Sequence, residues 1–306
     1  MQADQPYSRR IKFDGFLVLT ALVWGSGFVA QRIAAASMGS YTFNAGRFIL
    51  GAVIVFSVAG FRWQVQKDQL RWMGLAGLVL FCGSTLQQLG MKTTTAGNAG
   101  FLTSLYVVII PFLLLVFARQ KIQAVIWVAI GLAALGALLL STGGQYQPAP
   151  GDWLVLAGAL FWAAHVIIVG TRGRQSEPLM FTVGQFAVAA VINLIFALLF
   201  DYGKTAPQPE AWLALLYSAV VPVGIGFTLQ VIGQRHAPPI DAALIFSLEA
   251  VFAALIGYLI LNERMLPIQL LGCGLILLAI IITQINSYKQ IATNKIGIER
   301  QDLFSE

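Results

Sequence analysis

The sequence predicts an all-α membrane protein in which ten transmembrane helices form an inverted 5+5 repeat. Hydrophobic residues make up 58% of the 306 residues and charged residues only 10%, whereas soluble domains carry about 25% charged residues. Apolar runs of about 20 residues, the length of a membrane-crossing helix, recur along the whole chain. The chain also repeats itself, because residues 86–136 align with residues 229–279.

The repeat fixes the expected orientation of the two halves. Each copy holds five apolar runs, an odd number, so the second copy must cross the membrane in the opposite direction to the first. Such inverted repeats are typical of transporters whose solute site lies between the halves near mid-membrane. Equivalent positions are Trp24 and Trp162, Gln87 and Gln230, Ser104 and Ser247, and Tyr106 and Glu249.

Glycine and proline clusters, such as Gly143-Gly144 and Pro238-Pro239, separate the apolar runs. Residues 1–13 are expected to form an N-terminal segment, and residues 287–306 a C-terminal tail. The first five-helix repeat is expected over residues 14–142 and the second over residues 151–286. The predicted spans are 14–35, 41–61, 71–91, 97–117, 122–142, 151–171, 179–200, 211–232, 240–261 and 266–286.

The basic residues indicate which way the chain enters the membrane. Arg47 lies well inside a predicted helix, and fourteen of the 19 Lys and Arg residues lie in segments on the side of the N-terminus. This bias follows the positive-inside rule and predicts that both termini are cytoplasmic. The four basic residues on the outer side are Arg32, Lys92, Lys204 and Arg264.

Several partners are not expected. The net charge of +6 comes from basic residues scattered singly and in pairs through short loops, which does not favour a nucleic-acid surface. Two cysteines and two histidines leave a zinc site almost no ligands, and the phosphate-binding loop motif is absent from the sequence. We expect no metal and no cofactor. The expected partners are a small-molecule solute and the lipid bilayer, with monomer and homodimer both open.

Three ionisable residues lie deep inside the predicted spans, namely Arg47, His165 and Glu249. A charge at the centre of a membrane helix costs at least about 2.5–3.5 kcal/mol, so such residues face the bundle interior or a wet cavity. Arg47 and Glu249 either form an ion pair that locks the two halves, or Glu249 contacts the solute or accepts a proton. His165 either moves protons or donates one structural hydrogen bond.

A solute pathway is expected where both repeats contribute polar or aromatic side chains. The alternative role for the polar ones is hydrogen bonding between helices, which contributes about 0.6 kcal/mol each. Pro111 and Pro222 lie inside predicted spans and are hinge candidates, because proline removes a backbone hydrogen bond. The residues expected to line the pathway are Trp24, Gln87, Tyr106, Trp162, Gln230 and Glu249.

The chain resembles the ten-helix, EamA-type members of the drug/metabolite transporter superfamily from about Gly15 to Thr283. The motifs that carry the resemblance are Leu22-Val23-Trp24-Gly25-Ser26, Gly46-Arg47-Phe48 and the stretch from Ser247-Leu248-Glu249 through Leu255 to Leu261-Asn262-Glu263. Two departures stand out. Ala250 replaces the proline that often follows this glutamate in the family, so a helix break is not expected there. Residues 117–120 lack the usual Gly-Glu pair.

The resemblance implies a secondary transporter in a bacterial-type inner membrane that exports small metabolites such as amino acids or amphipathic drugs. Alternating access at a cavity between the repeats is the expected mechanism, with proton coupling and uncoupled diffusion both open. The protein is not expected to be an enzyme. A membrane-embedded enzyme or a non-transporting membrane scaffold is the alternative, and it would produce no solute flux.

Overall fold

A computed structural model describes residues 5–63, 65–145, 147–201, 207–261 and 266–303, and every regular element within these residues is helical. Asn262, Glu263, Arg264 and Lys204 lie outside the described residues. The elements are α1 (Gln5–Ser37), α2 (Ser40–Val58), α3 (Lys67–Gly90), α4 (Ala96–Ser104), α5 (Tyr106–Phe117), α6 (Ala124–Thr142), α7 (Asp152–Thr171), the 3-10 turn η1 (Gly173–Gln175), α8 (Pro178–Phe200), α9 (Pro209–Ser218), the π-helix η2 (Ala219–Phe227), α10 (Thr228–Gly233), α11 (Pro239–Phe246), α12 (Leu248–Leu261) and α13 (Pro267–Leu303).

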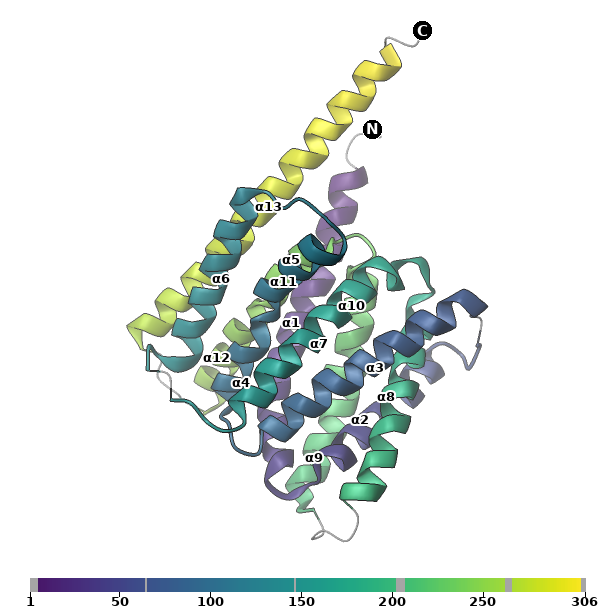
Figure 1. Ribbon diagram of the computed structural model, residues 1–306, viewed down its shortest axis with the longest axis vertical. Coiled ribbons are helices and arrows are strands. Elements are labelled where there is room, and N and C mark those ends of the chain that lie inside the picture. Colours follow the sequence, from purple (N-terminus) through teal and green to yellow (C-terminus); the bar gives the residue numbers. More distant parts are fainter. Residues whose placement is uncertain (1–4, 64, 146, 202–206, 262–265, 304–306) are drawn as a thin grey trace.

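The described residues form ten apolar spans that are long enough to cross a membrane, which confirms the predicted fold class. Four spans are built from more than one element: α4 with α5, α7 with η1, α9 with η2 and α10, and α11 with α12. The last helix, α13, continues to Leu303 and so includes most of the segment expected to be a tail. In Figure 1, α1 begins and α13 ends at the same end of the bundle.

Two of these spans are interrupted within one residue of equivalent positions of the repeat. α4 ends at Ser104 and α5 begins at Tyr106, while α11 ends at Phe246 and α12 begins at Leu248. The interruption beside Glu249 is the single residue Ser247, whose backbone stays in the right-handed helical region (φ −57°, ψ −18°). The Ser247 hydroxyl donates to the Ala243 carbonyl at 3.2 Å, a back-bond that Thr283 also makes to Ala279 inside the continuous helix α13.

The helices pair in a pattern that is unchanged when the two repeats are exchanged. Helix α2 packs against its equivalent α8, and α6 packs against its equivalent α13. Helix α3 packs on α7, and its equivalent, the span that contains η2 and α10, packs on α1. In the same way, α4 and α5 pack on α7, and their equivalents α11 and α12 pack on α1. This exchange is what a duplicated chain with a central two-fold axis requires.

Equivalent helices run in opposite directions. At one end of the α2–α8 pair the rings of Tyr41 and Phe200 lie 5.8 Å apart, and further along the rings of Phe48 and Phe186 lie 5.7 Å apart. Residue numbers therefore rise along α2 as they fall along α8. The antiparallel pairing fits the inverted repeat that the sequence predicts.

The α6–α13 pair depends on close backbone contact between glycines. A Cβ atom on Gly136 would lie 2.7 Å from the carbonyl oxygen of Gly272, and one on Gly272 would lie 2.6 Å from that of Gly136. Small residues at such crossings let membrane helices approach closely. A Cβ atom on Gly131 or on Gly274 would meet no other atom within 4 Å, so these two glycines take no part in the contact.

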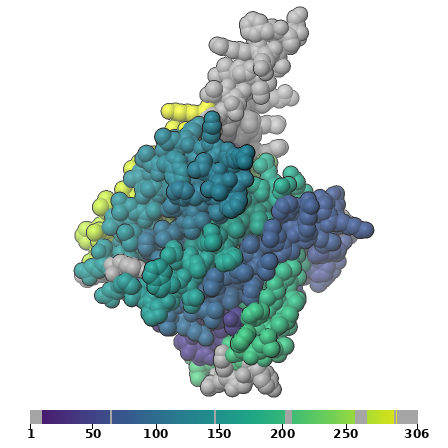
Figure 2. All heavy atoms as spheres, viewed as in Figure 1, coloured from purple at the N-terminus to yellow at the C-terminus, as the bar shows by residue number. Residues whose placement is uncertain are grey.

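The outer surface of the bundle is apolar. Large side chains such as Val128, Leu135, Leu160 and Leu198 are exposed on α6, α7 and α8, as lipid-facing positions should be. Figure 2 shows one side of this surface, where α7, α3 and α8 lie side by side. Polar residues are instead concentrated in the interior between the repeats.

Candidate functional site

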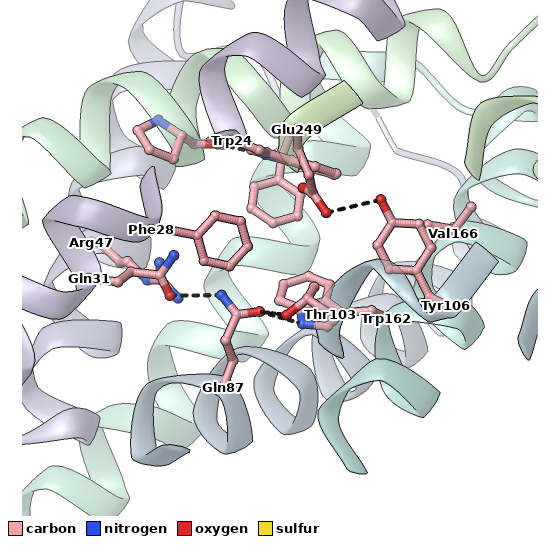
Figure 3. A pocket seen from close by; sticks show the side chains of 12 residues that line it. Trp24, Phe28, Gln31, Arg47, Gln87, Thr103, Tyr106, Trp162, Val166 and Glu249 are labelled. Atoms are coloured by element: carbon pink, nitrogen blue, oxygen red, sulfur yellow. Dashed lines mark hydrogen bonds between the residues drawn. The ribbon is translucent and has the colours of Figure 1, made fainter. Parts of the chain in front are cut away.

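A cavity lies between the two repeats. Side chains from α1, α2, α3, α4 and α5 form its walls together with side chains from α7, η2 and α12. Figure 3 shows most of them pointing toward a common centre. The lining residues are Trp24, Phe28, Gln31, Arg47, Gln87, Thr103, Tyr106, Trp162, Val166, Pro222, Phe227 and Glu249.

Half of the lining residues form pairs that the sequence repeat makes equivalent. Extending the alignment of Trp24 with Trp162 by four residues matches Phe28 with Val166. The cavity is therefore centred where the two repeats meet, as expected for a site on the axis that relates them. The equivalent pairs in the wall are Trp24 with Trp162, Phe28 with Val166, and Tyr106 with Glu249.

The two tryptophans form an aromatic wall with Phe227. Trp162 stacks on the Phe227 ring with a centroid separation of 6.0 Å, and the Trp24 ring lies 5.0 Å from the same ring. The Trp24 indole Nε1 donates to the carbonyl oxygen of Pro222 at 3.2 Å. Pro222 belongs to the π-helix η2, and insertions of this kind often occur at functional sites.

Gln87 organises the polar wall through three hydrogen bonds. Its Oε1 accepts from Trp162 Nε1 at 2.9 Å and from Thr103 Oγ1 at 3.2 Å. Its Nε2 donates to Gln31 Oε1 at 2.8 Å. This network, drawn as dashed lines in Figure 3, joins α1, α3, α4 and α7 across the repeat interface.

Glu249 begins the second half of a broken span and faces the cavity. The Tyr106 hydroxyl donates to Glu249 Oε1 at 3.4 Å (Figure 3), and this bond joins the starts of α5 and α12. A Cβ atom on Gly25 would lie 2.5 Å from the Glu249 carbonyl oxygen, so glycine lets α1 approach the break. Glu249 is 2% exposed and has no salt bridge within the described residues.

Arg47 lies in another part of the wall. Its guanidinium lies 5.0 Å from the centroid of the Phe43 ring and 5.1 Å from that of Phe48. Its buried Nε has no hydrogen-bond partner. In Figure 3 the ring of Phe28 lies between Arg47 and Glu249. The ion pair considered from the sequence is not formed, because both salt bridges among the described residues involve Arg10.

The structure brings most of the expected pathway residues to this cavity. Trp24, Gln87, Tyr106, Trp162 and Glu249 all line it. Gln230 does not, although it is equivalent to Gln87. It is fully buried, donates from Nε2 to Gln234 Oε1 at 3.0 Å and leaves its own Oε1 without a partner.

Of the three remaining candidate residues, Pro222 lines the cavity, and His165 and Pro111 do not. His165 is fully buried outside the lining, with Nε2 2.7 Å from Gln185 Oε1. Pro222 lines the cavity, whereas Pro111 lies inside α5, beyond the break that precedes Tyr106. The described residues contain no group of three or more His, Cys, Asp or Glu side chains placed to hold a metal ion.

Sequence reasoning missed Phe28, Gln31, Thr103, Val166 and Phe227 as lining residues. A signal for three of them was present. Positions four and seven residues after Trp24 share its face of a helix, and these positions are Phe28 and Gln31. Val166 lies four residues after Trp162 in the second repeat. Only the packing of other helices could identify Thr103 and Phe227.

Ten membrane spans around an interior cavity with aromatic and polar walls define a polytopic membrane protein of the transporter type. The model of the EamA-like transporter family matches residues 12–142 and 149–285. These two matches cover most of the chain, and the chain therefore belongs to the EamA-like transporter family.

Known proteins of similar sequence support this assignment. A protein of Archaeoglobus fulgidus described as an uncharacterized transporter is 34% identical over 282 residues, covering 90% of this chain and 87% of its own length. The threonine/homoserine exporter RhtA of Escherichia coli K12 is 26% identical over 278 residues, covering 86% and 88%. A crystal structure with 17% identity covers 91% of this chain and 98% of its own, with a TM-score of 0.74, and shows the same fold.

Proposed function

We propose that this protein is a secondary transporter that exports small, neutral or zwitterionic, partly apolar metabolites, such as amino acids or amphipathic drugs. The observation that carries the proposal is the cavity at the repeat interface, half of whose lining consists of equivalent pairs. A site on the axis between inverted repeats can be reached from either side when the two repeats exchange conformations.

The cavity wall suits a solute with an apolar body and few polar groups. Trp24, Phe28, Trp162 and Phe227 offer aromatic surface, and aromatic side chains bury large areas of an apolar partner. A single cation, Arg47, is too little for a polyanion, which needs several. RhtA exports threonine and homoserine, and we extend export of amino acids to this chain as part of the proposal.

Glu249 is the residue that we expect to respond to protons. A buried carboxylate without a cationic partner is costly, and no described residue supplies that cation to Glu249. A proton or the ammonium group of a solute would each remove this cost. Competition between the two would couple solute export to proton entry.

The breaks in the spans favour movement at this level of the bundle. Tyr106 lies directly after one break and Glu249 two residues after the other, and discontinuous helices form the binding sites of many secondary transporters. Pro222 in the π-helix η2 remains the better hinge candidate of the two prolines, because it lies in the cavity wall. The inner membrane and cytoplasmic termini belong to the same proposal.

The test is solute flux into proteoliposomes that contain the purified full-length protein. Labelled threonine, leucine and phenylalanine should enter vesicles preloaded with the same unlabelled amino acid, and empty vesicles should show no exchange. Trp162→Ala, in the cavity wall, should reduce exchange about tenfold or more, because it removes aromatic contact area. Trp153→Ala is the matched control, since Trp153 is 74% exposed on the same helix.

The result would also separate the competing functions. A membrane-embedded enzyme or a scaffold produces no exchange with any solute. Absence of exchange across amino acids, purines and cationic dyes, in protein that reconstitutes as a monodisperse species, would overturn the transport proposal. Equal exchange by the two tryptophan variants would remove the cavity from it.

A further inference from the structure

Arg47 is a buried cation without an anionic partner. It is 4% exposed inside α2, its Nε has no hydrogen-bond partner, and neither salt bridge among the described residues includes it. Its guanidinium nevertheless contributes to the cavity wall. A guanidinium presents five donors in a planar fork that matches a carboxylate, and Arg47 is one of the residues that line the cavity.

The aromatic contacts of Arg47 explain how the charge is held but not why it is there. Phe43 and Phe48 lie on the same helix, and their rings lie within about 5 Å of the guanidinium carbon. Contacts of this kind offset part of the cost of burying a cation. They satisfy none of its hydrogen-bond donors, and Phe43 and Phe48 are themselves fully buried.

The repeat shows that the charge is specific to one side of the cavity. The residue equivalent to Arg47 is Gln185, which is uncharged and fully buried, with Oε1 2.7 Å from His165 Nε2. The helix pair α2–α8 therefore carries the cation in the first repeat alone. A role in holding the repeats together would apply equally to both positions, whereas contact with a solute group need not.

Three further polar residues that line the cavity also come from the first repeat. Gln31, Gln87 and Thr103 line the cavity, but their counterparts in the second repeat do not. These counterparts are Val169, Gln230 and Phe246. The cavity thus has a polar end that includes Arg47 and an aromatic centre around the two tryptophans. An amphipathic solute would place its anionic group at the polar end.

We infer that Arg47 binds the carboxylate of the transported solute, so that the substrate class is carboxylate-bearing, partly apolar metabolites. The inference rests on the proposed transport function and deepens it. The apolar body of the solute lies against the aromatic centre of the cavity. Glu249 lies in a different part of the wall, beyond Phe28 (Figure 3), and does not compete for the carboxylate.

The experiment compares each amino acid with its own amide in proteoliposomes. Threonine, leucine and phenylalanine are tested beside threoninamide, leucinamide and phenylalaninamide, which lack the carboxylate but keep the body and the ammonium group. Wild-type protein should exchange each amino acid about tenfold to a hundredfold better than the amide, in the range of a lost hydrogen-bonded charge contact. Arg47→Gln should bring this ratio close to one.

Two further variants keep the result interpretable. Arg47→Lys retains the charge without the fork and should show an intermediate ratio, even where Arg47→Gln reconstitutes poorly. Gln185→Asn changes the equivalent position and should leave the ratio at its wild-type value. Exchange of the amides by Arg47→Gln at the wild-type rate would show that the cavity itself remains intact.

The outcomes separate the inference from the function on which it rests. Wild-type exchange with no preference for the carboxylate would overturn the inference and leave transport standing. An unchanged preference in both Arg47 variants would overturn it in the same way. Absence of wild-type exchange for every solute would instead overturn the proposed function, and the inference with it.

Discussion

Replacing Gln87 with leucine should destabilise the protein by far more than the same change at Gln230. The two positions are equivalent in the sequence repeat, and both side chains are buried. Gln87 makes three side-chain hydrogen bonds, to Trp162, Thr103 and Gln31. Leucine is similar in size, so the change removes the hydrogen bonds with little change in packing.

The magnitude follows from these contacts. At about 0.6 kcal/mol for each hydrogen bond in a membrane interior, the three bonds of Gln87 sum to about 2 kcal/mol. Gln230 makes one side-chain bond, to Gln234, and its Oε1 is already unpartnered. Removing an unpartnered buried oxygen offsets the loss of one bond, so Gln230→Leu should change the free energy of unfolding by less than about 1 kcal/mol.

The assay is equilibrium unfolding of the full chain in mixed micelles with increasing denaturing detergent, followed by far-UV circular dichroism. Both variants are compared with wild type under one set of conditions. A loss for Gln87→Leu no larger than that for Gln230→Leu would refute the view that the Gln87 network joins the two repeats. Solute exchange should fall in parallel, because Trp162 loses its hydrogen-bond acceptor.

The remaining predictions use the same full-length protein. Gly136→Leu should destabilise the fold by about 1–3 kcal/mol through overpacking. Gly131→Leu should change the free energy of unfolding little, because there is open space around Gly131. Similar losses of stability in the two variants would contradict the contact between α6 and α13 at Gly136. Asp241→Asn should cost about 1–3 kcal/mol, because it weakens the bond that Asp241 accepts from Arg10 at 2.6 Å while Arg10 keeps its salt bridge to Asp14; wild-type stability in the same unfolding titration would count against that ion pair. Glu249→Gln should abolish the acceleration of amino-acid exchange by a proton gradient, since an amide cannot exchange a proton for a solute ammonium, and gradient-driven flux at the wild-type level would exclude Glu249 from coupling.

The number and position of the spans could be derived from the chain alone because a bilayer imposes a simple rule. Each crossing needs a long apolar run, so the ten runs predict ten helices, which the structure contains. The same rule makes every polar residue in a run conspicuous, and this drew attention to Arg47, Gln87 and Glu249. Similarity between the two halves then predicted which residues would be equivalent.

The direction in which each side chain points could not be derived in this way. Gln87 and Gln230 are equivalent in sequence, yet only Gln87 reaches the cavity wall, because the polar end of the cavity lies on one side of the axis between the repeats. Arg47 and Glu249 seemed able to pair by depth alone, but Phe28 lies between them (Figure 3). Depth in the membrane follows from residue number, whereas rotation about a helix axis depends on its neighbours.

The chain alone thus determined the all-helical class, the ten crossings and the equivalence of the two halves, since hydrophobic length and internal similarity are properties of sequence. Tertiary packing decided where the helices break, which glycines touch and which polar groups meet in the cavity. Ser247 ends α11 where no proline stands, and Gly136 rather than Gly131 contacts α13. These features depend on contacts between segments far apart in the chain, and no local pattern encodes them.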